Sequence, residues 1–112
     1  MGEPEPDKPG EPGQFNNQDS EIKPLFELGQ LVGTPGAFQA LQDAGQEPLE
    51  FILRHVTGDW GQLDDEDKRE NDLSVEQGFR ILSAYELNTG EKIWVITEWD
   101  RSATTILLPS EY

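Results

Sequence analysis

The chain has 112 residues with 8 basic and 23 acidic side chains, and its formal net charge is −15. This length gives room for one domain. No apolar run approaches the roughly 18 residues of a membrane span, and the first residues lack the basic start and apolar stretch of a signal peptide. We therefore expect a cytoplasmic protein. Its charge repels nucleic-acid backbones, so we expect a protein partner with a basic surface rather than a nucleic acid or a membrane.

The sequence offers few groups for metal or redox chemistry. It has no cysteine and a single histidine, His55, which excludes disulfides, thiolate metal sites and sites with two imidazoles. The carboxylates lack the spacing of a calcium loop. A phosphate loop, a dinucleotide fingerprint and a nucleophile elbow are also missing. We expect no metal and no cofactor.

Composition divides the chain into a tail and one domain. Residues 1–22 are rich in Pro, Gly, Glu, Asn and Gln. Such a segment cannot bury enough apolar surface to offset its chain entropy, which predicts a disordered acidic tail before a single domain over residues 23–112. The apolar segment 25–33 follows the tail. Periodicity does not decide whether it forms a strand or an arm laid on the domain.

Three short helices are expected next. The first begins after Thr34, a suitable N-cap, and ends at Gly45. The second covers residues 48–58 and has an apolar stripe at helical spacing. The residues of this stripe are Leu49, Ile52, Leu53 and Val56. The third begins near residues 64–65, ends at Gly78 and has a charged outer face.

After Gly78 the apolar period changes to two, which predicts strands over residues 79–87, 92–99 and 103–108. The sequence thus predicts an α+β fold. An N-terminal layer of about three short helices would pack on one face of a three- or four-stranded antiparallel meander. The predicted core comprises Leu53, Ile81, Ile93, Val95, Ile96 and Ile106, with Trp94 or Trp60 covering an edge.

Several long runs carry a family resemblance. They are Thr34-Pro35-Gly36-Ala37, Arg54-His55-Val56-Thr57-Gly58-Asp59-Trp60-Gly61, Arg80-Ile81-Leu82-Ser83-Ala84-Tyr85, and the segment from Trp94 to Pro109. On these runs, residues 25–112 resemble a family of small proteins of bacterial plasmids and integrative elements, usually labelled plasmid-related proteins. The resemblance implies a mobile-element origin and brings no established activity. A second label of that family, subunit of a type I restriction enzyme, does not fit a chain too short for a methyltransferase fold.

One functional hypothesis is enzymatic. Helices followed by an antiparallel meander are similar in architecture to small microbial ribonuclease toxins. In such a site His55 or Glu98 would exchange protons, and Arg101 and Arg80 would stabilise the charge developing on phosphorus. The structural alternatives are a histidine that stabilises a helix C-terminus and an ordinary ion pair between Glu98 and Arg101. Convergence of these side chains in one cleft would favour the enzyme.

The leading hypothesis is a non-enzymatic interaction protein that binds a host or element-encoded protein. A DNA-mimic inhibitor of a restriction or other defence system is one concrete form. The candidate partner-binding residues form a loop and helix with many carboxylates. They are Asp59, Asp64, Asp65, Asp67 and Glu70. The alternative is a merely solvated helix face.

Overall fold

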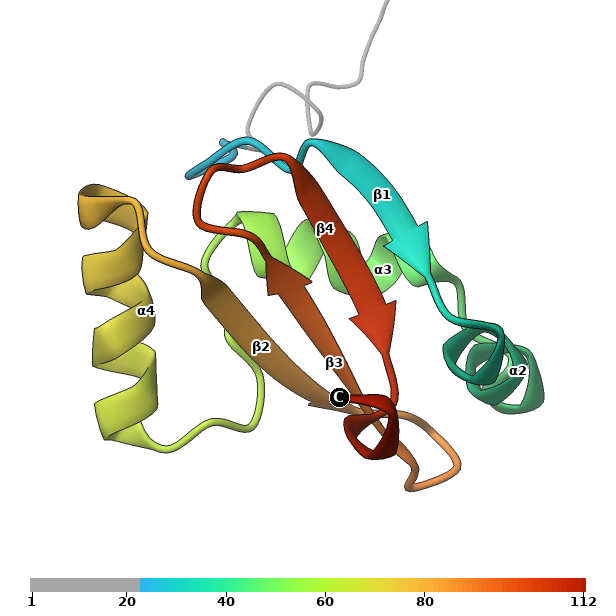
Figure 1. Ribbon diagram of the computed structural model, residues 1–112. Coiled ribbons are helices and arrows are strands. Elements are labelled where there is room, and N and C mark those ends of the chain that lie inside the picture. Colours follow the sequence, from blue (N-terminus) through green and yellow to red (C-terminus); the bar gives the residue numbers. More distant parts are fainter. Residues whose placement is uncertain (1–22) are drawn as a thin grey trace, which may run out of the picture.

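The computed structural model describes residues 23–112, so the expected tail over residues 1–22 lies outside the described part. Three helices and a four-stranded sheet confirm the predicted α+β class (Figure 1). The elements in chain order are β1 (Gln30–Gly33), α2 (Pro35–Ala44), α3 (Pro48–Val56), α4 (Asp65–Gln77), β2 (Ile81–Glu86), β3 (Lys92–Thr97) and β4 (Ala103–Leu107).

The sheet has the strand order β1-β4-β3-β2. Strands β2, β3 and β4 form the expected antiparallel meander. Strand β1 pairs with β4 in parallel, with Gln30 opposite Ala103 and Gly33 opposite Ile106, so the prediction of a purely antiparallel sheet was wrong. Parallel neighbours need a long crossover connection. The three helices and the first hairpin, all placed between β1 and β4, supply one.

Both alternatives for segment 25–33 hold, each for a different part. Its last four residues form β1, and the residues before them pack on the domain as an arm. The Leu25 N–H donates to the Val56 carbonyl at the end of α3, at 2.8 Å. Leu28 lies against the hydrophobic core. The arm therefore covers the end of α3 before the chain enters the sheet.

Helix boundaries follow local sequence closely. The Thr34 hydroxyl accepts the Ala37 N–H at 3.1 Å and caps α2, and the Asp64 carboxylate accepts the Asp67 N–H at 2.8 Å and caps α4. Gly45 and Gly78 end these helices at φ 68° and 79°, in the left-handed region that favours glycine. These predictions are confirmed, whereas α3 ends at Val56 rather than at Gly58.

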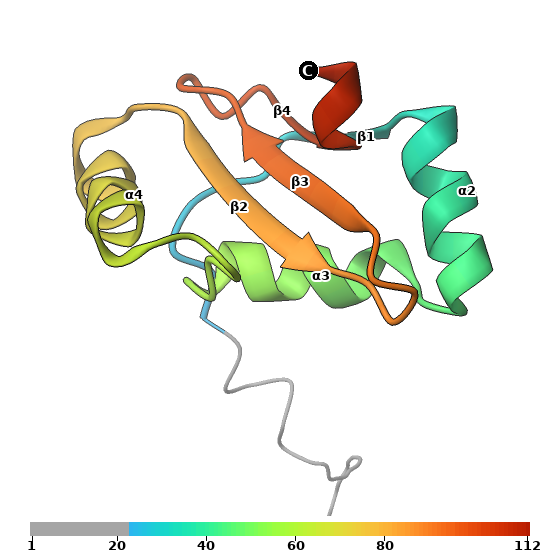
Figure 2. The ribbon, with the colours of Figure 1, turned by 90° about the horizontal axis from the view of Figure 1, so that it is seen from below.

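The helices do not form one layer. Helix α3 lies across one face of the sheet, while α2 and α4 flank the sheet on opposite sides (Figure 2). Helix α4 has no apolar stripe with which it could cover a sheet, because its buried residues are Asn71 and Ser74. It is therefore held at the β2 edge by polar contacts, and within residues 23–112 no α-helix lies over the other sheet face (Figure 1).

The core lies between the sheet and α3, and α2 contributes Ala37, Ala40 and Leu41. All predicted core residues of the strands are buried. They are Ile81, Ile93, Val95, Ile96 and Ile106, and Trp60 is buried as well. The prediction for Leu53 was wrong, because its side chain is 37% exposed. The buried residues of α3 are Phe51, Ile52, His55 and Val56, so the helix is rotated from the expected stripe toward His55.

The C-terminal residues approach the face opposite α3. A short 3-10 helix, Pro109–Glu111, follows β4, and the Thr34 hydroxyl donates to Glu111 Oε1 at 2.6 Å. The Tyr112 ring meets Trp94 edge to face, with centroids 5.5 Å apart. Within residues 23–112, no helix is both long and apolar enough to cross a membrane.

Candidate functional site

The predicted catalytic histidine belongs to a buried polar chain. His55 Nδ1 lies 2.6 Å from Ser83 Oγ, and its Nε2 lies 2.9 Å from Thr97 Oγ1. The Thr97 hydroxyl is 2.7 Å from that of Thr104, which donates to the Leu28 carbonyl at 2.7 Å. All four side chains of this hydrogen-bonded series are fully buried. They are His55, Ser83, Thr97 and Thr104. Helix α3 and all three strands of the meander thus meet at one polar line inside the core.

Counting donors along this line fixes the tautomer of His55. The Thr104 hydroxyl donates its single hydrogen to the Leu28 carbonyl, so the Thr97 hydroxyl must be the donor in its contact with Thr104. The Thr97 oxygen then accepts from Nε2–H, and Nδ1 accepts from the Ser83 hydroxyl. Burial of the ring keeps the imidazole neutral, so its single proton is on Nε2. Burial lowers the pKa of His55 from 6.5 to about 3.

Aromatic side chains enclose the ring. Phe26 from the arm meets His55 edge to face at 5.2 Å, and Trp60 does so at 6.0 Å. The Arg101 guanidinium lies 5.6 Å from the centroid of Phe26, on the outside of this wall. His55 is therefore separated from solvent and has no access to a substrate in this structure.

Arg101 stabilises the fold and does not contact His55. Its guanidinium donates to the carbonyls of Ser74, Phe79, Glu98 and Trp99, at 2.7 to 3.2 Å. The Ser74 contact reaches the last turn of α4, where unpaired carbonyls favour a cation. Arg101 adopts φ 60°, an uncommon value for a residue with a side chain. It joins the turn between β3 and β4 to the end of α4.

Glu98 and Arg80 lie near Arg101 and do not reach His55. Within residues 23–112, no ion pair joins Glu98 to Arg101, so that structural alternative was wrong. The Glu98 N–H continues the ladder to Ala103 at 3.0 Å, and strand alternation turns its side chain away from the face where Thr97 meets His55. The Arg80 guanidinium donates to the Tyr112 hydroxyl. The structure thus brings Arg101, Glu98 and Arg80 together at one end of the β2–β3 pair, whereas His55 is buried in the core and shares no cleft with them.

The acidic candidates occupy two places. Asp59 accepts from Arg54 at 2.7 Å and from the Gly61 N–H at 3.1 Å, and the hydrogen bond from Arg54 holds its pKa below the usual range. It stabilises the turn after α3. Asp64 is exposed at the N-cap of α4, and Asp65, Asp67 and Glu70 are exposed in the first half of this helix. Only this second group forms a continuous surface on one element.

A pocket of about 270 Å³, which we call the acidic pocket, lies between α4 and β2. Its lining residues are Leu63, Asp67, Glu70, Asn71, Ser74, Arg80 and Leu82. Two of the predicted partner-binding carboxylates, Asp67 and Glu70, thus face a hollow with an apolar side made by Leu63 and Leu82. In the described part of the chain, no group of three or more histidine and carboxylate side chains could hold a metal ion.

Two important residues were missed in the sequence. The Asn71 side chain donates to the Leu82 carbonyl at 2.7 Å and accepts its N–H at 3.3 Å, which fixes α4 against β2. Thr97, at the end of the apolar run Ile93-Trp94-Val95-Ile96, links His55 to β4. A polar residue at an inward position of a buried strand is the signal that would have identified Thr97.

Comparisons of the chain with protein-family models, with curated proteins and with solved structures gave no match.

Proposed function

We propose that this protein is a non-enzymatic interaction protein that binds a protein partner with a basic surface. The observation that carries the proposal is the acidic pocket, where carboxylates of α4 and apolar side chains meet at the edge of the sheet. The resemblance to plasmid and integrative-element proteins makes a host or element-encoded protein the expected partner. A DNA-mimic inhibitor of a restriction or other defence system is one concrete form.

The pocket chemistry suits a lysine or arginine side chain of the partner. Such side chains lay an apolar stem along apolar surface and keep the charged head near polar groups. Leu63 and Leu82 offer the apolar surface, and Asp67 and Glu70 offer acceptors for the head. Arg80 also lines the pocket, and its guanidinium donates to the Tyr112 hydroxyl.

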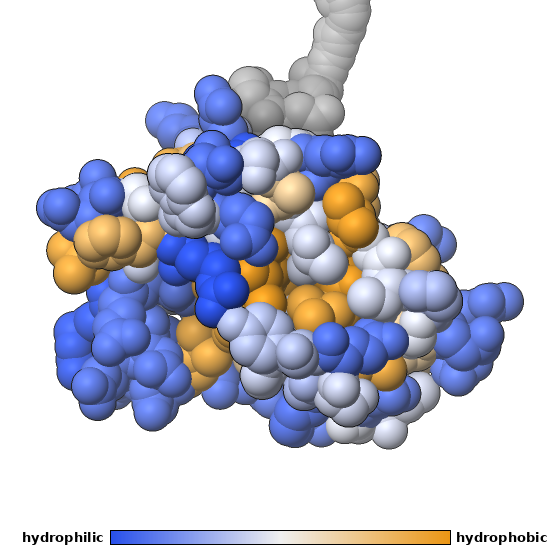
Figure 3. Space-filling view, in the orientation of Figure 1, coloured by the Kyte–Doolittle hydropathy of each residue, from blue (hydrophilic) through white to orange (hydrophobic). Residues whose placement is uncertain are grey.

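The surroundings of the pocket support the same partner class. From Asp64 to Gln77 the chain has seven acidic and two basic residues. Figure 3 shows hydrophilic side chains over α4 and apolar side chains exposed in the middle of the adjoining sheet face. The carboxylates of α4 would accelerate the encounter with a basic partner. The adjoining apolar surface would then be buried in the complex.

The same geometry gives little support to a ribonuclease. A general acid or base must come within hydrogen-bond reach of the group it protonates. His55 is neutral, buried and enclosed by Phe26 and Trp60. Arg101 is committed to backbone carbonyls, so both residues are explained by folding alone.

The proposal is tested by titrating the full chain with an arginine-rich peptide while backbone amide signals are followed by NMR. We expect shifts concentrated on α4 and β2, and weaker binding as salt is added. The double variant Asp67→Asn, Glu70→Gln should weaken binding by about tenfold or more. Its matched control is Asp43→Asn, Glu47→Gln, which removes the same charge from exposed residues at the opposite side of the sheet.

If the two double variants lose equal affinity for the peptide, the effect comes from overall charge, and the acidic pocket is rejected as the binding site. A second experiment addresses the enzyme directly by expressing the chain in a bacterial host. Growth arrest by the wild type that His55→Ala relieves, with the variant still folded, would replace this proposal with a catalytic one.

A further inference from the structure

The two edges of the sheet are treated differently. At the β2 edge, the Asn71 side chain pairs with both backbone groups of Leu82. The next outward residue, Ala84, donates its N–H to the Trp60 carbonyl at 3.2 Å, and its carbonyl accepts the Gln62 N–H at 2.7 Å. This edge therefore has no free ladder positions at Leu82 and Ala84.

The β1 edge has free positions. Gln30 and Thr34 donate to the Ser102 and Ile106 carbonyls of the β4 side, both at 3.0 Å. Because alternate residues of a strand at a sheet edge direct their backbone groups inward and outward, the N–H and C=O of Leu31 and Gly33 point away from β4. An edge of this kind is a template for another strand.

Strand β1 is short, with four residues, but its sequence, Gln-Leu-Val-Gly, has no charged residue and no proline. Natural edges commonly carry lysine, proline or an inward charge. Residues 28–42 contain no charged side chain, although the chain as a whole has a net charge of −15. Leu31 and Val32 are 54% and 43% exposed on the two sides of this strand. The β1 edge is therefore both uncharged and lined by exposed apolar side chains.

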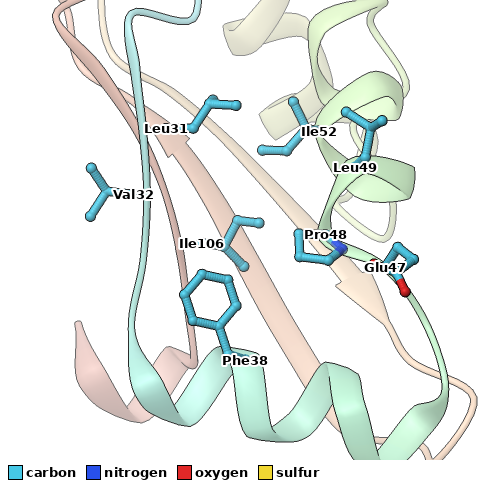
Figure 4. Close-up of a pocket in the computed structure, with 8 residues that line it drawn as sticks. All are labelled: Leu31, Val32, Phe38, Glu47, Pro48, Leu49, Ile52 and Ile106. Atoms are coloured by element: carbon cyan, nitrogen blue, oxygen red, sulfur yellow. The ribbon is translucent and has the colours of Figure 1, made fainter.

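An apolar groove runs beside the strand. It has a volume of about 290 Å³ and lies between β1, α2 and α3 (Figure 4). Leu31 points into the groove toward Ile52, and Val32 points to the other side of the strand (Figure 4). Leu49, 57% exposed, extends the apolar lining on α3. The groove and the free edge form one continuous surface.

We propose that the occupant of this edge is a second copy of the chain, paired antiparallel through β1 about a two-fold axis at Val32. Leu31 and Gly33 are placed symmetrically about Val32, so Leu31 of each copy would exchange both backbone hydrogen bonds with Gly33 of the other. Two such pairs make the contact isologous. The product is an eight-stranded sheet with the order β2-β3-β4-β1-β1-β4-β3-β2.

Side chains fit this register. A Cβ atom at Gly33 would lie 2.3 Å from the Phe38 ring, so the ring packs directly against the strand at that residue. Leu31 of the second copy would arrive opposite Gly33, where it has the ring beneath it and no opposing side chain. The axis also places both α3 helices on the same face, so their Leu49 side chains extend one apolar layer.

Charge favours a second copy over a basic partner at this edge. Two chains of net charge −15 repel each other over most of their surface, but the neutral strip 28–42 brings no carboxylates into opposition. A basic partner finds no carboxylate on β1, and the groove beside it is lined by one carboxylate, Glu47, among apolar side chains. The acidic pocket lies at the opposite edge of the sheet, so the dimer would present one such pocket at each end.

Sedimentation equilibrium of the full chain over a concentration series tests the proposal. We expect a monomer–dimer equilibrium that added salt strengthens, since salt screens the net charge. Amide exchange at Leu31 and Gly33 should slow as the dimer forms. Leu31→Lys should weaken dimerisation by about tenfold or more without unfolding the domain, because this side chain is largely exposed. The matched control, Leu73→Lys on α4, replaces a leucine that is 51% exposed and should leave the dimer intact.

A chain that stays monomeric at all concentrations and in high salt would overturn the proposal. So would a dimer that Leu31→Lys leaves unchanged, or one that Leu73→Lys weakens equally. If the chain is monomeric but an extended apolar peptide slows amide exchange at Leu31 and Gly33, the edge belongs to another protein, which also rejects the second copy. If Leu31→Lys unfolds the domain, Val32→Lys, on the other side of the strand, provides the same test.

Discussion

The Nε2 atom of His55 lies 2.9 Å from the Thr97 hydroxyl oxygen, so a polar contact inside the core ties α3 to strand β3. The contact continues through Thr104 to the Leu28 carbonyl and requires an imidazole that donates from Nε2, and burial of the ring favours its neutral form. Protonation would give Nδ1 a hydrogen that must compete with the Ser83 hydroxyl at 2.6 Å. The fold and the charge of one side chain are therefore coupled.

This coupling predicts a pH dependence of stability. The pKa of His55 falls from 6.5 in an unfolded chain to about 3 in the folded one, so the unfolded state binds the proton more readily. The contribution of the neutral ring is fully present above pH 6.5 and is lost progressively as the pH falls toward 3. Denaturant unfolding at several pH values should show a loss of about 1.4 kcal/mol per pH unit from this group within that window.

Because His55 is the single histidine of the chain, its ring protons give one NMR titration signal. We expect that signal to stay in the neutral position from pH 7 to below pH 5 while the domain is folded. The variant His55→Gln should lose the extra slope between pH 6.5 and 5, where carboxylates contribute little. A normal titration near pH 6.5 in the folded wild type would contradict the buried polar line.

Arg101 is predicted to act on stability. Arg101→Ala removes the donors to Ser74 and Phe79 and leaves a residue with a side chain at φ 60°, so we expect a loss of about 1–3 kcal/mol in the free energy of unfolding. Arg101→Gly removes the same bonds at a φ that glycine tolerates. It should therefore be more stable than the alanine variant, by about 1 kcal/mol. Equal stability of both variants and the wild type would exclude this role.

Asn71 is predicted to hold α4 on the sheet. Asn71→Ala leaves the N–H and C=O of Leu82 without their partner, which should cost about 1–3 kcal/mol. Amide exchange should accelerate most in α4. Gln77→Ala, at an exposed position of the same helix, is the control and should change stability by less than about 0.5 kcal/mol. Faster exchange spread evenly over the domain would contradict a local function of Asn71.

Local signals in the sequence were sufficient for the elements but not for their assembly. Thr34, Asp64 and Gly78 mark helix ends through hydrogen bonds and φ values that depend on neighbouring residues alone. The parallel pairing of Gln30 with Ala103 depends instead on residues 73 positions apart in the chain, and a four-residue strand with two apolar side chains carries no signal of its direction in the sheet.

The candidate site shows the same division. Exposed carboxylates such as Asp67 and Glu70 were predictable, since their helix has no apolar stripe. The burial of His55 was not, because Leu53 completes a better apolar stripe than His55 does. Hydrogen bonds of His55 with Ser83 and Thr97, which belong to two separate strands, help to decide which face of α3 turns inward.

The last prediction concerns Gly61, which pairs with Ala84 in an isolated bridge at the β2 edge. Gly61 has φ 79°, and a Cβ atom there would lie 1.9 Å from the Ala84 carbonyl oxygen. Gly45 has a similar φ of 68° with nothing within 4 Å of its Cβ position. Gly45→Ala should therefore cost only the left-handed penalty, about 1–2 kcal/mol. Gly61→Ala should cost clearly more, because the segment from Trp60 to Gln62 must leave β2 and free the ladder groups of Ala84. Thermal or denaturant unfolding of the two variants measures the difference, and equal losses would mean that this segment yields without releasing the edge.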